Sequence, residues 1–578
     1  MELFDAAKIR MKPKLQRGIS RRLEETPAQD DVFSAAFRHD ILVAADSQLG
    51  QDQLASIRQQ LSDAWGSENV VAVESSSLPN LPRDGPYVLV QEKIFRPYRL
   101  KSHSGLRIAG EYPSSLSVAV PSRGPHSHGK RSEIEGYRFA IKDCFEVAGL
   151  RATVGCRTYY AVNERATTTA PIIGKLIEVG AHLLGTLKLG SLNTKEEPAE
   201  SADFQASFNP RGDGYQSASS SSGGSGAAAA SYEWLDFTLG TDTTGSSRRP
   251  AYANGVFQMR LSHDAVTQEG IIPSWRPFDA PAIFSREMDI IRKSPMYCNL
   301  SLTLAKPTRL VYLEDYYPLS DKRQQDLFEQ LFTDIESMYS ITRARISLSD
   351  LWSERKPAGT SHTSLSCYMH NIGILSFCYG LYHQLDAFRT NYHEQYGAEP
   401  YVNPTTRWRW DAATNITAEQ YEEAVDRLKV YKKWLLEDVL QSADHETLVV
   451  LPVSEQIPDP RDQPAALPSA PSATQQLWLS PILGAPEISV PIGEIDDFSR
   501  ITRQYEPLPV IATVLGLPGT DIALVENMAT VLNHTGRGVK AGTGSSMYST
   551  YGSRESVFVR HTEAKKPPPP KQASCPAA

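Results

Sequence analysis

Residues 217–250 read SASSSSGGSGAAAASYEWLDFTLGTDTTGSSRRP, and this stretch decides the fold. Two clusters of serine, threonine and glycine, residues 219–224 and 240–246, flank an alanine-rich run and an apolar segment. A flexible Gly/Ser linker would not lead directly into alanines, the best helix formers, and then into Trp234 and Leu235. The sequence therefore predicts a helix and then a strand between two packed polar loops. Packed small polar residues imply close backbone approach, positive φ or chemistry.

A third motif precedes these two loops, since residues 139–143, FAIKD, place a lysine after an apolar run. In this order the motifs resemble the amidase signature family, serine hydrolases in which a Gly-Ser-Ser-Gly-Gly loop and a Gly-Thr-Asp-x-Gly-Gly-Ser-x-Arg loop are joined by a helix. The resemblance covers residues 134–544. It is closest to a fungal branch of amidase-like proteins, some labelled scytalone dehydratase-like, and DGYQ at 213–216 and YEWLDF at 232–237 support that branch. It implies an α/β fold with a large mixed β-sheet sandwiched by helices.

The resemblance assigns three catalytic residues: Ser246 as the nucleophile, Ser221 as the bridging serine and Lys142 as the base. Lys142 must then be neutral near pH 7, against an ordinary pKa of about 10.4, and burial at a strand end lowers the pKa of a lysine. The neighbouring Asp143 would keep the lysine protonated on contact, so we expect the strand to turn Asp143 to its other face. In the family the bridging serine follows a cis peptide bond, here Ser220–Ser221.

The resemblance also assigns the oxyanion hole and its supports. The backbone N–H groups expected to form the hole are those of Thr243, Thr244, Gly245 and Ser246. The side chains expected to support the loop are those of Ser222, Asp242 and Arg248. The family usually has glycine where this chain has Ser220 and Thr244. A β-branched residue is strained at positive φ, so distorted donors and reduced activity stay open as an alternative.

Without the ordered motifs, the same residues have simpler interpretations. A run of serines is ordinarily a loop, and Lys142 beside Asp143 is ordinarily a surface ion pair. Cys144 lies close to Lys142 in sequence, but no histidine motif accompanies it, so we interpret it as a small core residue. The six cysteines show neither CxxC nor a Cys/His metal spacing, which predicts reduced thiols and no metal.

Composition narrows the function classes for this chain of 578 residues with a formal net charge of −8. Basic residues are scattered, which indicates neither nucleic acid nor anionic lipid as a partner. The first residues are charged throughout and lack the apolar centre of a secretory signal, and no apolar run approaches the ~20 residues of a membrane helix. The expected location is therefore cytoplasmic.

The chain divides into three parts. Residues 1–130 are predicted to form a small N-terminal α+β accessory domain, residues 131–550 the amidase signature domain, and residues 551–578 a disordered tail rich in proline and lysine. The strands predicted in the first part are residues 41–45, 70–73 and 87–90. A helix follows the first of them, with Leu54, Ile57 and Leu61 at helical spacing and Asp46 or Ser47 as its cap.

Four further features lie in the central part. Asp279 and Pro281 resemble a family segment beyond the nucleophile loop. The aromatic residues of 312–385 are interpreted as core, although in the family this part of the chain helps to form the acyl side of the cleft. Thr417 to Gln420 form a capping box that opens a helix. Residues 458–471 are predicted to be a proline-rich surface loop.

The motifs together predict a serine hydrolase that cleaves the amide bond of a small molecule through an acyl-enzyme. Linear amides, and also esters, are the expected substrates, with no metal and no organic cofactor. The fungal resemblance suggests secondary metabolism, and a homodimer is compatible with the sequence. One alternative is a catalytically impaired amidase-fold protein that serves as a binding or assembly component. A second is the ammonia-generating subunit of an amidotransferase.

Overall fold

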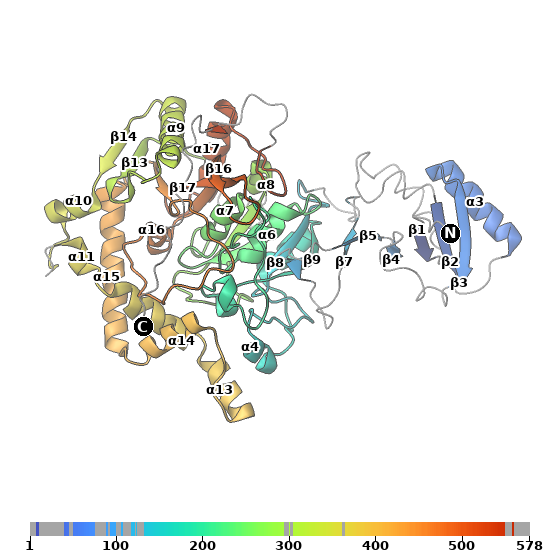
Figure 1. Cartoon of the computed structure of the whole chain (residues 1–578), viewed down its shortest axis with the longest axis horizontal. Coiled ribbons are helices and arrows are strands. Elements are labelled where there is room, and N and C mark those ends of the chain that lie inside the picture. Colours follow the sequence, from blue (N-terminus) through green and yellow to red (C-terminus); the bar gives the residue numbers. More distant parts are fainter. Residues whose placement is uncertain are drawn as a thin grey trace, which may run out of the picture.

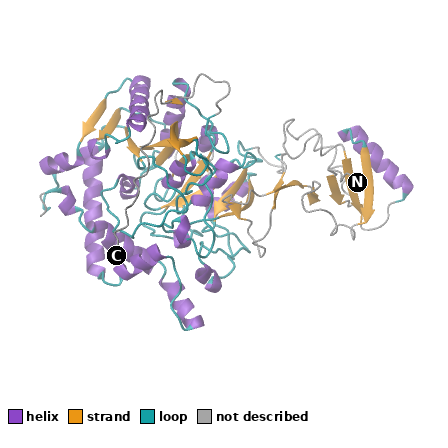
Figure 2. Ribbon diagram, viewed as in Figure 1, coloured by secondary structure: helices purple, strands orange, loops and turns teal. Residues whose placement is uncertain are grey.

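The structure is a computed structural model of the 578-residue chain. It describes residues 7–10, 40–45, 50–74, 88–90, 93–99, 106–107, 117–121, 123, 132–293, 300, 304–360, 364–548 and 558–559. These residues form a six-stranded sheet near the N-terminus and a twelve-stranded sheet in the larger body. Figure 1 shows the six-stranded sheet to one side of that body, and Figure 2 shows the helices gathered around the larger sheet.

The N-terminal sheet has the strand order β3-β2-β1-β4-β5-β7. Its elements are β1 (Ala7–Arg10), β2 (Asp40–Ala45), α3 (Gln51–Trp65), β3 (Asn69–Glu74), β4 (Val88–Val90), β5 (Lys93–Arg99) and β7 (Ser117–Pro121). The three strands and the helix predicted here are confirmed. The expected cap residues Asp46 and Ser47 lie outside the described residues. Helix α3 instead begins after Gly50, whose backbone N–H donates to the Gln53 side chain at 3.1 Å.

The larger sheet has the order β14-β13-β15-β17-β16-β11-β12-β10-β8-β9-β6, with β18 paired to β16. Its strands are β6 (Leu106–Arg107), β8 (Arg138–Lys142), β9 (His182–Leu187), β10 (Phe237–Asp242), β11 (Phe257–Arg260), β12 (Ala280–Ser285), β13 (Arg309–Leu313), β14 (Arg343–Ile346), β15 (Thr447–Pro452), β16 (Glu487–Phe498), β17 (Tyr505–Leu515) and β18 (Phe558–Val559). Parallel pairs such as β8 with β10 and antiparallel pairs such as β10 with β12 both occur, so the predicted mixed sheet is confirmed.

The short strand β18 corrects one expectation. The tail from residue 551 was predicted to be disordered, yet Phe558 and Val559 pair in parallel with Glu494 and Ile495 of β16. The rest of that tail lies outside the described residues. Strand β6 likewise comes from the predicted N-terminal accessory part but pairs with β9 of the larger sheet.

Helices cover both faces of the larger sheet. They are α4 (Arg157–Val162), α5 (Pro171–Glu178), α6 (Gly223–Ser231), α7 (Arg248–Asn254), α8 (Met288–Lys293), α9 (Lys322–Tyr339), α10 (Leu348–Arg355), α11 (Leu365–Tyr368), α12 (Tyr379–His383), α13 (Asp386–Tyr396), α14 (Pro404–Ala413), α15 (Ala418–Trp434), α16 (Gln476–Leu483) and α17 (Asp521–His534). The predicted capping box of α15 is present, with Thr417 and Gln420 bonded reciprocally.

Alternate residues of β13 face different cores: Leu310 and Tyr312 pack with α9 and α17, whereas Val311 packs with α10 and α15. A strand buried on both faces explains its continuous apolar sequence.

Strands β8 and β10 bring two of the sequence motifs to the same edge of the sheet. They are parallel, with Phe139 opposite Phe237 and Ile141 opposite Leu239, and the two phenylalanine rings stack with centroids 5.2 Å apart. Because parallel strands end at the same edge, Lys142 comes to lie beside the loop that follows β10.

Helix α6 is buried along its whole length, which explains its small residues. A Cβ on Gly226 would lie 2.8 Å from the carbonyl oxygen of Pro250 in α7, so only glycine permits this approach.

Candidate active site

Lys142 lies at the end of β8 with its side chain fully buried. Its Nζ is 2.8 Å from Ser221 Oγ and 2.7 Å from Thr241 Oγ1, hydrogen-bonding distance from both hydroxyls. Burial lowers the pKa of Lys142, although the charges of Cys144, Asp279 and Asp242 oppose this shift. The site therefore favours a neutral amine whose neighbours are hydroxyl groups.

Asp143 is turned away from this amine, as the strand alternation predicts. Its carboxylate accepts hydrogen bonds from the Thr153 hydroxyl at 2.5 Å and from the Thr153 backbone N–H at 3.1 Å. The simpler interpretation of Lys142 and Asp143 as a surface ion pair is wrong, since both residues are buried.

The serine loop lies next to Lys142. The Ser220–Ser221 peptide bond is cis, as the resemblance implies. Ser222 supports the loop with its Oγ, which donates to the Thr241 carbonyl at 3.0 Å and accepts from the Thr241 N–H at 3.3 Å. Its backbone N–H donates to the Ser246 carbonyl at 3.0 Å. These bonds tie the loop before α6 to both ends of the loop after β10.

Ser246 is half-buried and lines the cavity with Ser220. Its hydroxyl makes no hydrogen bond to any residue in the described part of the chain. Lys142 thus contacts Ser221 directly, and Ser246 lines the cavity without a hydrogen bond between its hydroxyl and that of Ser221.

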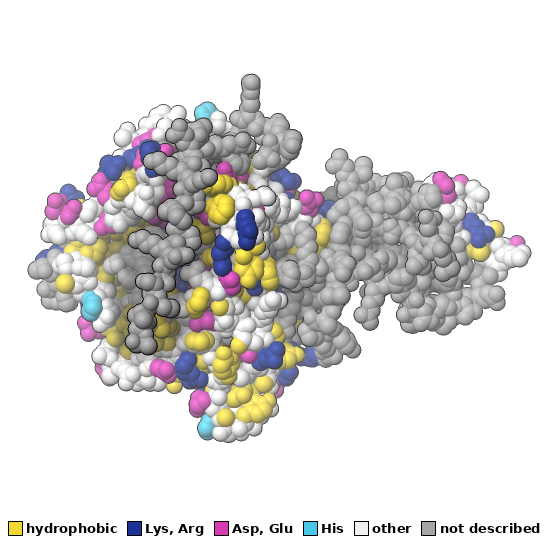
Figure 3. Space-filling model, in the orientation of Figure 1, with side chains coloured by type: hydrophobic (Ala, Val, Ile, Leu, Met, Phe, Trp, Pro, Cys, Tyr) yellow, Lys and Arg dark blue, Asp and Glu magenta, His cyan; other side chains and the backbone are white. Residues whose placement is uncertain are grey.

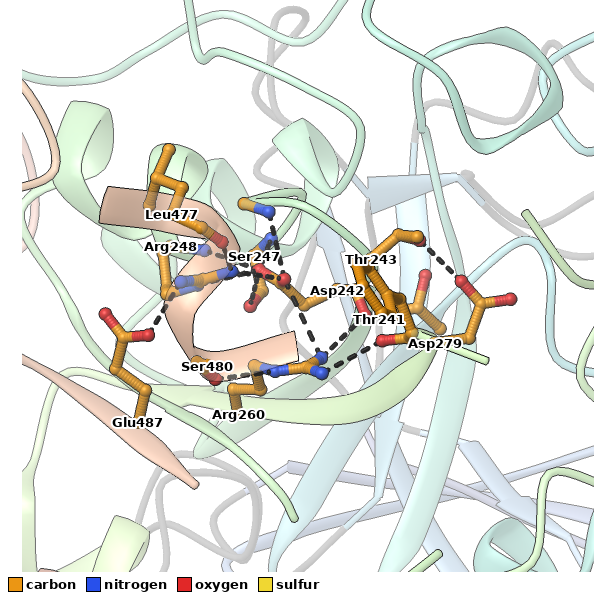
Figure 4. A network of polar contacts seen from close by, with 12 residues as sticks. Thr241, Asp242, Thr243, Ser247, Arg248, Arg260, Asp279, Leu477, Ser480 and Glu487 are labelled. Atoms are coloured by element: carbon orange, nitrogen blue, oxygen red, sulfur yellow. Dashed lines mark hydrogen bonds and ion pairs between the residues drawn. The ribbon is translucent and has the colours of Figure 1, made fainter. Parts of the chain in front are cut away.

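A buried network of charges holds the loop after β10 (Figure 4). Arg248 lies between two carboxylates, 2.8 Å from Asp242 and 2.6 Å from Glu487. Arg260 donates to the Asp242 carbonyl at 2.8 Å and to Ser480 Oγ at 2.9 Å. Burial alone would raise the pKa of Asp242, but the charges of Arg248 and Arg260 and the hydrogen bonds from the loop lower it well below its ordinary value. Asp242 is therefore held as an anion.

The predicted oxyanion hole needs one correction. The Gly245 N–H donates to Asp242 Oδ1 at 3.0 Å, so it does not point freely into the cavity as expected. The physical reason is the position of Asp242, which also accepts from the Ser247 N–H at 2.8 Å and so curls the loop around its carboxylate. The N–H groups of Thr243, Thr244 and Ser246 remain as candidates.

The strain that a positive φ would cause at Thr244 does not arise. Gly245 has φ of 113°, whereas Thr244 is not among the described non-glycine residues with positive φ. The positive φ thus falls on Gly245, and the β-branched Thr244 fits before it.

The cavity beside these residues has a volume of about 230 Å³. It is lined by the serine loop, the loop after β10 and residues from α14 and α16; these include Asn193, Thr194, Ser219, Ser220, Thr243, Thr244, Gly245, Ser246, Arg249, Ser274, Phe377, Arg409 and Trp478. Residues 465–471 of the predicted proline-rich surface loop also line it. Of the aromatic residues noted in 312–385, Tyr312, Tyr317 and Phe377 are buried in core clusters as predicted, and Phe377 also lines the cavity.

Sequence reasoning missed several residues of this site. Arg260 and Glu487 complete the buried charge network, and Thr241 contacts the lysine. Asp279, singled out only by resemblance, accepts from the Thr243 hydroxyl at 2.5 Å, and burial raises the pKa of its carboxyl group. The available signal for Arg260 was a charged residue between the apolar residues Met259 and Leu261.

The described residues show no site for a metal and no membrane-spanning helix. Within these ranges, no group of three or more His, Cys, Asp or Glu side chains is arranged to hold a metal ion. The helices within them are too short or too polar to cross a bilayer. On the face shown in Figure 3, side chains of both charges are interspersed over the described surface.

Comparison with known proteins agrees with this architecture. The family model described as Amidase matches residues 120–294, which include Lys142, Ser221 and Ser246. Amidase 1 of Arabidopsis thaliana is 26% identical over 445 residues, which cover 72% of this chain and 95% of that protein. A protein named Translocon at the outer membrane of chloroplasts 64, from Pisum sativum, is 33% identical over 173 residues, 30% of this chain and 28% of its own length.

Among solved structures, 6-aminohexanoate cyclic dimer hydrolase complexed with substrate is similar with a TM-score of 0.54 and 15% identity, covering 70% of this chain and 85% of that one. The fold is therefore that of the α/β amidases. Residues 120–294 thus resemble the Amidase family model, and 72% of the chain is similar to a curated protein named Amidase 1.

Proposed function

We propose that this chain is a serine hydrolase that cleaves an amide bond of a small molecule through an acyl-enzyme, with Ser246 as nucleophile, Ser221 as relay and Lys142 as base. The observation that carries the proposal is the buried Lys142 amine, whose Nζ lies 2.8 Å from Ser221 Oγ and whose pKa is lowered by burial. A lysine that loses its proton readily and contacts hydroxyl groups is suited to general base catalysis.

In the proposed first step, Ser246 Oγ attacks the carbonyl carbon of the amide. The Ser246 proton passes to Ser221 Oγ as the Ser221 proton passes to Lys142 Nζ. The carbonyl electron pair moves to its oxygen, which the free N–H groups of the loop after β10 stabilise. The C–N bond then breaks as the carbonyl re-forms, Lys142 returns its proton to Ser221, and Ser221 gives its proton to the leaving amine.

The second half of the reaction uses water. Water attacks the acyl-enzyme carbonyl, its proton passes to Ser221, and the Ser221 proton passes to Lys142. The ester bond to Ser246 then breaks as the proton returns from Lys142 through Ser221 to Ser246. The products are a carboxylic acid and an amine, and the enzyme returns to its starting protonation state. An ester would follow the same steps with an alcohol as leaving group.

A serine-directed fluorophosphonate probe tests the proposal. The wild-type protein should be labelled, and Ser246→Ala should lose the label. Ser469→Ala is the matched control, because Ser469 lies on the exposed loop that lines the same cavity; it should label like the wild type. Absence of labelling of the folded wild type would support the alternative, an amidase-fold protein that acts as a binding or assembly component.

The proposal also covers the domains, the location and the partners of the protein. We propose residues 1–130, apart from strand β6, as an accessory domain, residues 131–550 as the catalytic domain and a cytoplasmic location, with no nucleic acid partner. The resemblance to a fungal branch supports a role in secondary metabolism, and size-exclusion chromatography with light scattering tests for a homodimer. Copurification of a partner subunit would instead support an amidotransferase component.

A further inference from the structure

Two arginines line the cavity without an anionic partner in the described part of the chain. Arg249 stands in α7, three positions after Ser246, and Arg409 comes from α14. Neither guanidinium forms an ion pair or a hydrogen bond with a described residue. The Nε of Arg409 is buried without a hydrogen-bond partner, and its guanidinium carbon lies 5.3 Å from the centre of the Phe377 ring.

Both guanidinium groups belong to the neighbourhood of the nucleophile loop. The Arg249 Nε would lie 3.2 Å from a Cβ placed on Gly245, so this side chain packs against the residue before Ser246. Burial lowers the pKa of Arg409, and among the charges around it Cys378 opposes and Arg249 adds to this shift. The two cations are therefore close enough to repel each other.

Two fully buried arginines of this site differ from this half-buried pair. Arg248 has two carboxylate partners and Arg260 has three hydrogen-bond acceptors. Charged groups taken out of water are ordinarily paired, because an unpaired buried charge is strongly destabilising. Arg248 thus has carboxylate partners within the protein, whereas Arg249 and Arg409 face the cavity without such a partner among the described residues.

The remaining charges of the cavity wall limit what this anion can be. Lys195 and Glu197 pair with each other at 2.9 Å. Glu200 also lines the cavity, and its Oε2 is buried without a hydrogen-bond partner. Two acidic side chains in the wall disfavour a doubly charged phosphate and favour a singly charged carboxylate, which a planar guanidinium binds in a bidentate manner.

We propose that Arg249 and Arg409 bind a carboxylate group of the substrate, so that the enzyme prefers amides that carry a free carboxylate near the bond to be cleaved. The inference rests on the proposed function and names its substrate class. The two arginines position the substrate, and Ser246 reacts with its amide carbonyl.

The test compares two 4-nitroanilides of matched shape. The succinyl compound carries a carboxylate, and the 4-methylpentanoyl compound has an isosteric neutral group. The wild-type kcat/KM should be at least tenfold higher for the succinyl compound. Arg249→Gln and Arg409→Gln should each lower this ratio about 10- to 100-fold, the loss expected for hydrogen bonds to a charged group. The lysine replacements should retain part of the preference.

Arg407→Gln is the matched control on the same helix, because the Arg407 guanidinium bonds to the Pro400 carbonyl at 2.8 Å and does not line the cavity. It should leave the ratio unchanged. The inference is overturned if the wild type shows no preference for the succinyl compound, or if the Arg249 and Arg409 variants lower both rates equally.

A binding measurement separates this inference from the proposed function. Calorimetry with the Ser246→Ala protein should show succinamate binding, weakened at least tenfold by Arg249→Gln. Such binding without any hydrolysis by the wild type would support the carboxylate site and overturn the hydrolase. Hydrolysis of the neutral anilide without succinamate binding would do the reverse. Inorganic phosphate bound more tightly than succinamate would overturn the carboxylate assignment.

Discussion

Arg248→Met should remove the support of the loop that carries Ser246. The guanidinium is fully buried between Asp242 at 2.8 Å and Glu487 at 2.6 Å, and it also donates to the Leu477 carbonyl at 2.8 Å. Methionine fills much of the same volume but leaves both carboxylates in an apolar setting. Breaking a buried ion pair by removing one partner costs about 3–5 kcal/mol.

The remaining charges do not compensate for this loss. Arg260 is 3.7 Å from Asp242, but no described residue donates a hydrogen bond to Glu487 Oε1. We therefore expect Arg248→Met to lower the free energy of unfolding by about 3–5 kcal/mol. Glu487→Gln in the same background should recover part of the loss, because it removes the carboxylate that is left without a partner.

Urea unfolding followed by tryptophan fluorescence measures this change, provided that the m values of variant and wild type agree. Arg345→Met is the control, since Arg345 pairs with Glu314 at 2.8 Å with both side chains largely exposed. Its loss should stay below about 1 kcal/mol. A loss for Arg248→Met as small as that of the control would refute the inferred role of the buried network.

Three further predictions concern the loop and the base. Gly245→Ala should lower kcat/KM, because the added Cβ would lie 2.8 Å from Leu477 Cδ1 at a φ of 113°. The control is Gly214→Ala, where φ is 69° and no atom lies within 4 Å of the added Cβ. It should leave kcat/KM unchanged and show only the cost of positive φ in unfolding experiments. Ser222→Ala should lower the unfolding free energy by about 1–3 kcal/mol, since the Thr241 N–H and carbonyl lose a buried partner, and an unchanged value would contradict this. Because the pKa of Lys142 is lowered on folding, the unfolded chain binds more protons than the folded chain at pH values between the folded and the ordinary pKa. The unfolding free energy of the wild type relative to Lys142→Met should therefore rise with pH through that window, and kcat/KM should rise as Lys142 loses its proton. A flat stability difference and a flat rate profile would contradict a neutral base.

Much of the fold could be predicted from the sequence, because the signals for single helices and strands lie within a few neighbouring residues. The alanine-rich run forms α6, the apolar segment after it forms β10, and the Thr417 capping box opens α15 as predicted. The cap of α3 was placed wrongly, since Gly50 lacks the side-chain oxygen that marks such positions in a sequence.

The site was harder to predict where it depends on distant residues. Glu487 and Arg409 lie far along the chain from Ser246, and no short motif connects them. The direction of the Gly245 N–H follows from Asp242, whose position is fixed by Arg248 and, across the sheet, by Arg260. The role of residues 465–471 in the cavity wall likewise depends on how that loop folds back, which its proline content does not specify.

The same charge network bears on the lowered pKa of Lys142, because two carboxylates act against that shift. Asp279 and Asp242 both act to raise the pKa of Lys142, so an uncompensated anion here would favour the protonated form of Lys142. Asp242 is instead surrounded by Arg248 and Arg260, whose positive charges offset its pull on the amine. Burial raises the pKa of Asp279, which reduces the charge that it presents at a given pH. The arginines thus act on the lysine through Asp242, and Arg248→Met should raise the pKa of Lys142 and shift the rise of kcat/KM to higher pH. A shift in the opposite direction, in folded protein, would show that Asp242 does not couple the arginines to the base.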